Sequence, residues 1–137
     1  MNMACWLMKS EPAVYSWRQM VKDKKSAWTG VRNHQAGNNM KAMKTGDAAF
    51  FYHSNDGREI VGIVKVSKPY HPDPTDGSGK FGMVEVAAHK PLSRPVTLAG
   101  IKAHPLLKDM ELVRQPRLSV SKVSAEEWKT ICQMGGV

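Results

Sequence analysis

Eight consecutive residues combine the side-chain types that recognise a nucleobase. The segment Trp28-Thr29-Gly30-Val31-Arg32-Asn33-His34-Gln35 offers an aromatic ring, a guanidinium, two amides and an imidazole, with a glycine that lets a ligand approach the backbone. Aromatic and guanidinium planes stack on bases, which contributes about 1–3 kcal/mol per base. Amides supply the paired donor and acceptor that read a base edge. The structural alternative is that Trp28 anchors the core and Asn33 caps the next helix, and both roles can coexist.

Two further polar stretches follow short apolar runs. Lys9-Ser10-Glu11-Pro12 follows Ala4–Met8, and His53-Ser54-Asn55 follows Phe50-Phe51-Tyr52. Strand ends place side chains at the rim of a sheet, where binding sites commonly form. We therefore expect Ser10 to hydrogen-bond a base, Lys9 to meet a phosphate, and the His53–Asn55 tip to contact the ligand. The alternatives are a polar turn that stops at Pro12 and a hairpin turn through Ser54-Asn55-Asp56-Gly57.

The chain lacks the short motifs of common enzyme classes. It has no Gly-x-Ser-x-Gly, no phosphate-binding loop, no Gly-x-Gly-x-x-Gly and no His-Glu-x-x-His. Histidines are scattered without ligand spacing, at His34, His53, His71, His89 and His104. We expect no catalysis, no metal and no cofactor. A site assembled only in three dimensions, such as His53 with Asp56 or Glu11, is the alternative.

The positive charge is concentrated in the first third of the chain. The formal net charge is +8, of which residues 1–46 supply +6 and residues 47–137 only +2. A concentrated positive field favours a polyanion such as nucleic acid, although charge alone does not identify one. The N-terminus lacks the features of a secretion signal, and no stretch approaches the roughly 20 apolar residues that cross a bilayer. We expect a cytoplasmic protein without a membrane partner, in which Cys5 and Cys132 are core thiols.

The periodicity predicts a mixture of helices and strands. Helices are expected after Ser16, over His34–Lys44, after Thr97 and after Ser124, where Ser16 and Ser124 each begin a capping box. Strands are expected over Ala4–Met8, Asp47–His53, Glu59–Val66, Gly82–Ala88 and Arg117–Val123, with a loop over Tyr70–Gly79. This order lacks a regular β-α alternation. It predicts one α+β domain over residues 1–137, with a mostly antiparallel β-barrel-like sheet and flanking helices.

Several of these strings, in the same order, resemble the EVE domain family of the PUA-like superfamily. They are Trp6–Pro12, Trp28–Ala36, Phe50–Asn55, Val61–Ile63, Tyr70–Thr75, Ile101–Ala103, Arg117–Val120 and Glu127-Trp128. The resemblance implies a PUA-like barrel, related in architecture to the YTH domains that read methylated adenine. It also implies binding of modified bases in DNA or RNA.

The resemblance implies one pocket built from the three polar segments. The residues that would contact the base are Ser10, Glu11, Trp28, Val31, Arg32, Asn33, Gln35, His53, Ser54 and Asn55, and those that would contact phosphates are Lys9, Lys41 and Arg117. The chain departs from the family pattern at Gly37, where arginine is usual, and at Phe81, where tryptophan is common. We expect a monomeric, non-enzymatic reader of a methylated or hydroxymethylated base. The alternative is a general RNA-binding protein that acts on tRNA or rRNA without reading a modification.

Overall fold

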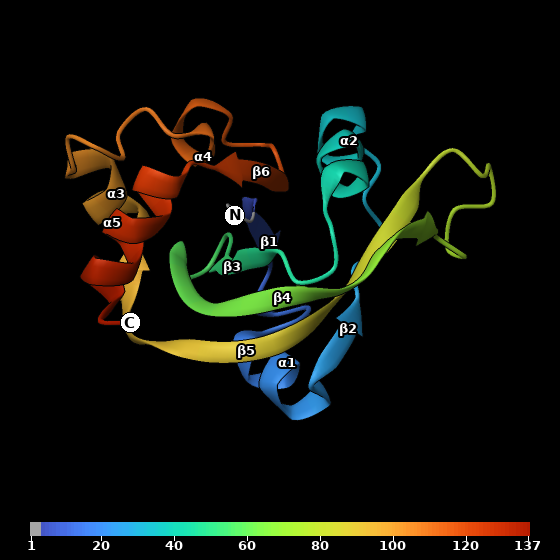
Figure 1. Ribbon diagram of the computed structural model, residues 1–137, viewed down its shortest axis with the longest axis horizontal. Coiled ribbons are helices and arrows are strands. Elements are labelled where there is room, and N and C mark those ends of the chain that lie inside the picture. Colours follow the sequence, from blue (N-terminus) through green and yellow to red (C-terminus); the bar gives the residue numbers. More distant parts are fainter. Residues whose placement is uncertain (1–3) are drawn as a thin grey trace.

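Alternating side chains along the central strands build two hydrophobic layers on opposite faces of one sheet. The computed structural model describes residues 4–137 (Figure 1). In β3 (Ala48–His53), Ala49 and Phe51 belong to one core cluster, whereas Phe50 and Tyr52 belong to the other. This alternation arises because successive side chains of a strand point to opposite faces.

Six strands form the sheet, in the spatial order β2-β5-β4-β3-β1-β6. The other strands are β1 (Cys5–Ser10), β2 (Lys25–Ala27), β4 (Glu59–Pro72), β5 (Gly82–Thr97) and β6 (Val120–Val123). All neighbouring strands are antiparallel except β1 and β3, which run parallel with Ser10 opposite His53. The carboxyl ends of β1 and β3 therefore meet at one edge, and this pairing brings two of the predicted polar segments together.

The sheet of the described residues is open rather than closed into a barrel. Strands β2 and β6 lie at its two edges and are not paired with each other. The α+β class and the mostly antiparallel pairing are confirmed, but the barrel-like closure expected from the sequence is not. Closing a barrel needs hydrogen bonds between the first and last strands, and β2 and β6 have only three and four residues.

Strands β4 and β5 are longer than the sequence predicted. β4 continues through Tyr70 to Pro72, a stretch that the predicted loop included, and β5 continues past Ala88 to Thr97. Pro91 and Pro95 are tolerated because β2 pairs only with Glu85–Ala87, so the far part of β5 has a free outer side. Proline occurs in sheets where its missing N–H has no strand partner. Shifts of register between β4 and β5 also accommodate the prolines.

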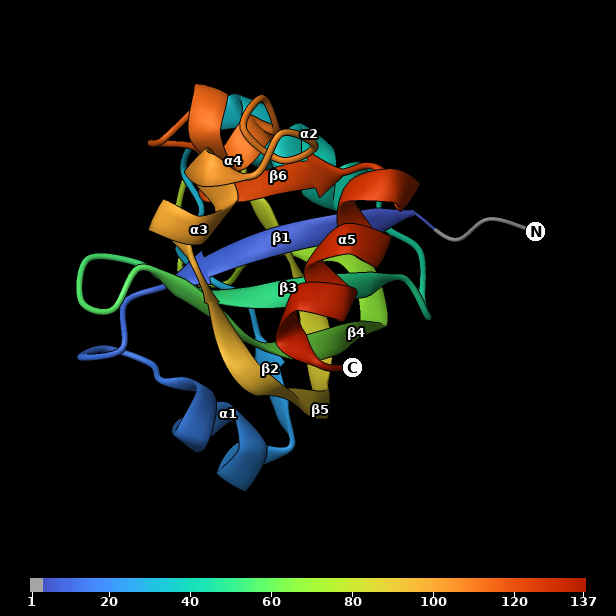
Figure 2. The same cartoon turned by 90° about the vertical axis from the view of Figure 1, so that its left-hand side faces the viewer.

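Helices cover both faces of the sheet. They are α1 (Trp17–Asp23), α2 (His34–Ala42), α3 (Leu98–Ala103), α4 (Glu111–Arg114) and α5 (Ala125–Gly135). Met20 of α1 and Met40 of α2 pack into one core cluster, whereas Ile101 of α3 and Ile131 of α5 pack into the other. In Figure 2, α5 lies across the face formed by β1, β3 and β4.

The predicted helix starts are confirmed at four positions. The side chains of Ser16, Asn33, Thr97 and Ser124 each accept a hydrogen bond from the backbone of the helix that follows. Ser124 and Glu127 form a complete capping box, whereas the Gln19 side chain bonds Asp23 instead of completing the box at Ser16. None of the helices within residues 4–137 has the length and apolar character needed to pass through a bilayer.

Candidate nucleic-acid interface

A pocket of about 640 Å³ opens where β1 ends beside β2. Its lining joins the first two polar segments of the sequence and consists of Lys9, Ser10, Glu11, Val14, Tyr15, Ser26, Ala27, Trp28, Thr29 and Gly30. The volume lies within the range of about 300–1,000 Å³ that is usual for small-molecule sites. The walls combine aromatic rings, hydroxyl groups and one charge of each sign. We refer to this cavity as the base pocket.

The end of β1 supplies one wall of the base pocket. The Ser10 hydroxyl donates to the Tyr15 carbonyl oxygen at 2.5 Å, which fixes the turn that follows β1. Lys9 donates through Nζ to the Pro116 carbonyl oxygen at 2.7 Å, and burial lowers the pKa of its ammonium group. An ammonium group has three N–H donors, so this bond leaves Lys9 able to donate to a phosphate as well. The Glu11 side chain is exposed at the rim.

Trp28 and Tyr15 supply the aromatic walls. Trp28 is only 9% exposed and meets Phe51 edge-on, with ring centroids 5.7 Å apart. It therefore belongs to the core, as the structural alternative predicted, and it also lines the base pocket. The Tyr15 hydroxyl donates to Asp23 at 2.9 Å, and burial raises the pKa of that phenol. Both rings are held by the fold, so the walls are in place without a ligand.

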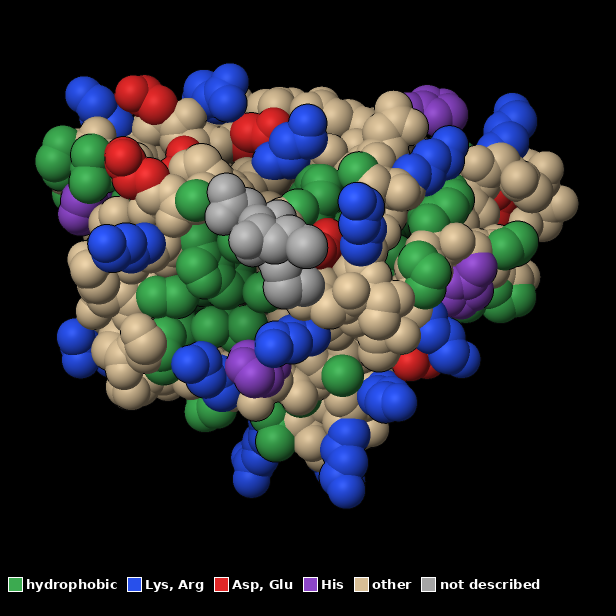
Figure 3. Space-filling view, viewed as in Figure 1, with side chains coloured by type: hydrophobic (Ala, Val, Ile, Leu, Met, Phe, Trp, Pro, Cys, Tyr) green, Lys and Arg blue, Asp and Glu red, His purple; other side chains and the backbone are tan. Residues whose placement is uncertain are grey.

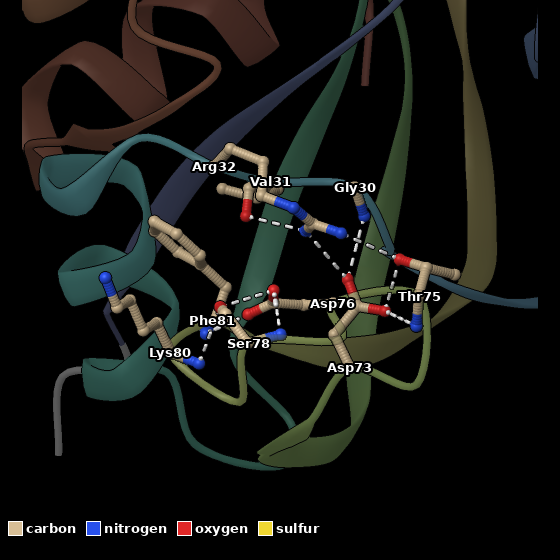
Figure 4. A network of polar contacts seen from close by, with 9 residues as sticks. All are labelled: Gly30, Val31, Arg32, Asp73, Thr75, Asp76, Ser78, Lys80 and Phe81. Atoms are coloured by element: carbon tan, nitrogen blue, oxygen red, sulfur yellow. Dashed lines mark hydrogen bonds and ion pairs between the residues drawn. The ribbon is translucent and has the colours of Figure 1, made fainter.

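Arg32 and Val31 lie in a separate polar network beside the base pocket. The Arg32 guanidinium pairs with the Asp73 carboxylate at 3.2 Å and donates to the Thr75 hydroxyl at 3.0 Å. The Gly30 backbone N–H donates to the same oxygen of Asp73 at 2.9 Å, and Figure 4 shows both donors converging on it. Val31 is buried in the core. This network anchors the segment after Trp28 to the turn between β4 and β5.

Asp73 is a buried charge with all its partners in place. Burial alone would raise the pKa of this carboxyl, but the hydrogen bonds from Thr75, Gly30 and Arg32 outweigh burial and lower the pKa to about 2. Its side chain is fully buried, whereas that of Arg32 is 40% exposed. Asp73 is therefore ionised at neutral pH and stabilises the loop rather than offering an acid or base to a ligand.

Asn33, Gln35 and Arg117 line a second, smaller hollow. Its volume is about 290 Å³, and Gln115, Pro116 and Leu118 complete the lining. The Asn33 side chain accepts from the Ala36 backbone N–H at 2.9 Å as the cap of α2. The bond from Lys9 to the Pro116 carbonyl oxygen ties this hollow to the wall of the base pocket. Arg117 is exposed, as expected for a phosphate contact.

The tip of β3 lies next to the end of β1 but is not part of the base-pocket lining. His53 Nε2 accepts from the Trp17 backbone N–H at 3.0 Å, and burial lowers the pKa of the imidazole. The Ser54 backbone N–H donates to the Ser10 carbonyl oxygen at 3.0 Å. Asn55 is exposed in the turn with φ +64°, a conformation that asparagine adopts readily. Ser54 thus holds the end of β1, and His53 holds the start of α1.

The structure gathers only part of the predicted site. Lys9, Ser10, Glu11 and Trp28 share the base pocket, whereas Lys41 lies elsewhere, with Nζ 5.6 Å from the centroid of the Tyr70 ring. Pocket residues that the sequence did not single out are Val14, Tyr15, Ser26 and Ala27. The aromatic Tyr15 shortly after Lys9-Ser10-Glu11 was the available signal. Within residues 4–137, no three His, Cys, Asp or Glu side chains are grouped as a metal site.

Comparison with known protein families gives one match over almost the whole chain. A family model described as "EVE domain" matches residues 4–134. Thymocyte nuclear protein 1 of Gallus gallus is 36% identical over 163 residues, which cover 94% of this chain and 67% of that protein. That name describes a nuclear protein and contradicts the cytoplasmic location expected from the sequence. The sequence features used for that expectation argue against secretion but do not separate the cytosol from the nucleus, which explains the error.

Solved structures support the same grouping. A protein from Rhodopseudomonas palustris, solved by NMR, shares 57% identity and has a TM-score of 0.93, with 98% of this chain and 94% of that chain covered. Human THYN1, solved in complex with DNA that contains 5-methylcytosine, shares 32% identity with a TM-score of 0.91, and 98% of each chain is covered. The YTH domain of Zygosaccharomyces rouxii MRB1 shares only the fold, with a TM-score of 0.58 at 19% identity over 98% of this chain and 87% of that chain.

Proposed function

Because the chain belongs to the EVE domain family, we propose that this single domain is a non-enzymatic reader of a modified base in nucleic acid, with modified cytosine as its preferred ligand. The observation that carries the proposal is the base pocket, with a fixed aromatic wall at Trp28 and a cation at Lys9. The similarity to human THYN1, whose solved complex contains 5-methylcytosine DNA, supports it.

In this proposal the base enters between the end of β1 and the Trp28–Gly30 segment. Trp28 and Tyr15 offer apolar contact to the flat ring, and the Val14 side chain, 79% exposed, lies at the mouth. Exposed apolar side chains at a pocket mouth gain from contact with a ligand. A base inside a duplex cannot reach such a pocket, so reading requires a base that is unpaired or extruded from the stack.

Glu11 would give the pocket its preference for cytosine. The exocyclic amine of cytosine is a hydrogen-bond donor, and carboxylates are suited to accept from it. Glu11 lies exposed in the lining, and Ser10 lies beside it. Thymine carries a carbonyl oxygen at the corresponding position and would be repelled. The same carboxylate would accept from the amine of adenine, so the shape of the pocket must separate cytosine from adenine.

Phosphate contacts would come from Lys9 and Arg117. Lys9 bonds the carbonyl oxygen of Pro116, the residue before Arg117, so the two cations belong to neighbouring parts of one surface. Asn33 and Gln35 line the hollow beside Arg117 and are candidates for contacts to the next nucleotide. These contacts do not depend on the base and should set the salt dependence of binding.

A fluorescence-anisotropy titration tests the proposal. Labelled single-stranded DNA and RNA carry cytosine, 5-methylcytosine, 5-hydroxymethylcytosine or N6-methyladenine at one position. Burying one methyl group contributes about 0.8 kcal/mol, so we expect about fourfold tighter binding of 5-methylcytosine than of cytosine. Equal binding of all strands with a steep salt dependence would contradict the reader proposal and favour general RNA or DNA binding.

Two matched variants locate the binding in the pocket. Glu11→Gln should lower the affinity for the modified cytosine strand about tenfold, because a contact that reads a base contributes about 1–3 kcal/mol of discrimination. Glu126→Gln, an exposed residue in the first turn of α5, makes the same chemical change away from the pocket and should leave the affinity unchanged. A Glu11→Gln variant that binds like Glu126→Gln would remove Glu11 from the site.

A further inference from the structure

A third hollow, distinct from the base pocket and from the hollow at Arg117, lies between α2 and the hairpin formed by β4 and β5. Its volume is about 340 Å³, and its lining consists of Lys41, Tyr70, His71, Pro72, Gly79, Lys80, Phe81 and Gly82. In Figure 3, hydrophobic, basic and histidine side chains adjoin one another on the right-hand side of the molecule, over α2 and this hairpin. We refer to this hollow as the hairpin hollow.

Tyr70 forms a flat aromatic surface in the hairpin hollow. A Cβ at Gly82 would overlap the Tyr70 ring and the His71 carbonyl oxygen, so only glycine at this position lets the ring lie against β5. Lys41 Nζ lies 5.6 Å from the centroid of the same ring. The ring is partly exposed. The arrangement therefore combines a supported aromatic plane with an exposed cation beside it.

Phe81, the residue before β5, supplies a second ring. The Arg32 guanidinium carbon lies 5.8 Å from its centroid, and the His34 ring packs at 5.1 Å. A Cβ at Gly37 would lie 4.0 Å from Phe81 Cδ1, so the helix contributes no side chain over that edge of the ring. Two partly exposed rings, Tyr70 in β4 and Phe81 just before β5, thus line the same hollow.

The charge around the two rings is positive. Lys41 and Lys80 line the hairpin hollow, and both are exposed, whereas the lining contains no Asp or Glu. The nearest acidic residues along the chain are already engaged. Asp73 bonds Arg32 and Thr75, and Asp76 accepts from the Phe81 backbone N–H at 2.7 Å. The cations of the hollow are therefore not neutralised by carboxylates in its lining.

We propose that the hairpin hollow binds a second, unmodified nucleotide of the strand whose modified base occupies the base pocket. An aromatic plane flanked by lysines is the usual composition of surfaces that hold single strands without reading sequence. Its base stacks on Tyr70, because Phe81 already packs against Arg32 and His34, and its phosphates meet Lys41 and Lys80. The Trp28–Gln35 segment connects the two sites, because Trp28 lines the base pocket and Arg32 packs on Phe81.

This inference rests on the proposed function for the first site, and strand length tests it. The double variant Lys41→Gln/Lys80→Gln removes both cations, and Lys102→Gln/Lys108→Gln removes two exposed lysines elsewhere. Each is titrated with a trinucleotide and with a 12-nucleotide strand, both carrying 5-methylcytosine. We expect the hollow variant to reduce the salt slope for the long strand by about 1.4, which corresponds to two phosphates at about 0.7 each. Its affinity for the trinucleotide should match that of the control.

A second readout reports stacking directly. The fluorescent base 2-aminopurine is placed at successive positions on either side of 5-methylcytosine, and we expect quenching at one or two positions on binding. Tyr70→Leu keeps an apolar side chain against Gly82. This variant should abolish the quenching and should weaken the binding of the long strand about fivefold or more. The lysine variant keeps the test valid if Tyr70→Leu does not fold.

The outcomes separate the two proposals. If the hollow variant keeps the affinity and salt slope of its control, and no 2-aminopurine position is quenched, the second site is overturned. If the double variant binds long strands more weakly than its control, but the wild-type protein binds modified and unmodified strands equally, the reader proposal fails and the strand-binding site stands.

Discussion

The two halves of the Trp28–Gln35 segment were both predicted to bind a base, but they have different surroundings in the structure. Trp28, Thr29 and Gly30 line the base pocket. Arg32 and Asn33, by contrast, have polar side chains that already bond within the protein, one with Asp73 and the other with the Ala36 backbone N–H. Partner occupancy, rather than residue type, therefore divides a segment of suitable chemistry into a binding half and a structural half.

The comparison has a simple thermodynamic basis. A buried polar group that loses its partner costs about 1–3 kcal/mol, and more if it is charged. A ligand that displaced Arg32 from Asp73 would meet this cost, whereas a ligand at the mouth of the base pocket would not. Substitutions in the structural half should therefore change stability first, and substitutions in the binding half should change affinity first.

The largest expected effect is the loss of stability when Asp73, the partner of the structural half, is replaced. Asp73→Ala removes the acceptor for Arg32, Gly30 and Thr75, and we expect the free energy of unfolding to fall by about 3 kcal/mol. Urea denaturation measures this change, with Asp109→Ala, an exposed aspartate, as the control. If Asp73→Ala keeps its stability and loses base binding instead, the assignment of this half as structural is wrong.

The pH dependence of stability tests the charge of the same carboxylate, and the variant used, Asp73→Asn, keeps the size of the side chain. The pKa of Asp73 is lowered in the folded state to about 2 from 3.8. A carboxyl whose pKa is lower in the folded state stabilises the protein at pH values above its pKa in the unfolded state. This contribution is lost as the pH falls through the pKa of the folded state. The shift corresponds to about 2 kcal/mol.

The stability gap between wild type and Asp73→Asn should therefore shrink by about 2 kcal/mol between pH 6 and pH 2. Urea midpoints at both pH values measure it, and the other carboxylates cancel because both proteins contain them. A gap that stays constant with pH would show that the charge on Asp73 does not contribute.

The smallest expected effect is the loss of stability when Asn33, which caps α2, is replaced. Asn33→Ala removes the cap of α2 and should cost about 1 kcal/mol of stability, whereas Asn33→Ser keeps a capping oxygen and should recover most of it. The preference for the modified base should be the same in both variants. A lost preference in Asn33→Ala, measured by the anisotropy titration at a temperature where the variant is folded, would move Asn33 into the binding half.

The sequence predicted local features well because their causes are local. The caps at Ser16 and Ser124 depend only on residues a few positions away. Elements β2 and α4 were missed, since three or four residues have no periodicity to detect. The open sheet could not be foreseen, because it depends on which distant strands pair.

The candidate site was only partly predictable for the same reason. Lys9-Ser10-Glu11 and Trp28 were recognised from residue type, and the parallel pairing of β1 with β3 explains why Ser10 lies opposite His53. Asp73 was not singled out from the sequence, because it lies 41 residues from its partner Arg32 and only the fold brings the two together. Residue types identify groups able to bind, but only the structure tells which of them the protein already uses.

Chemical-shift mapping with 5-methyl-2′-deoxycytidine tests the central claim most directly. On titration into isotopically labelled protein, we expect the largest amide shifts at residues 9–11 and 26–30, with small shifts at Asn33 and Asp73. The unmodified nucleoside should produce the same pattern at higher concentration. Shifts centred on Asn33, Gln35 and Arg117, with none at residues 26–30, would place the base elsewhere and contradict the account.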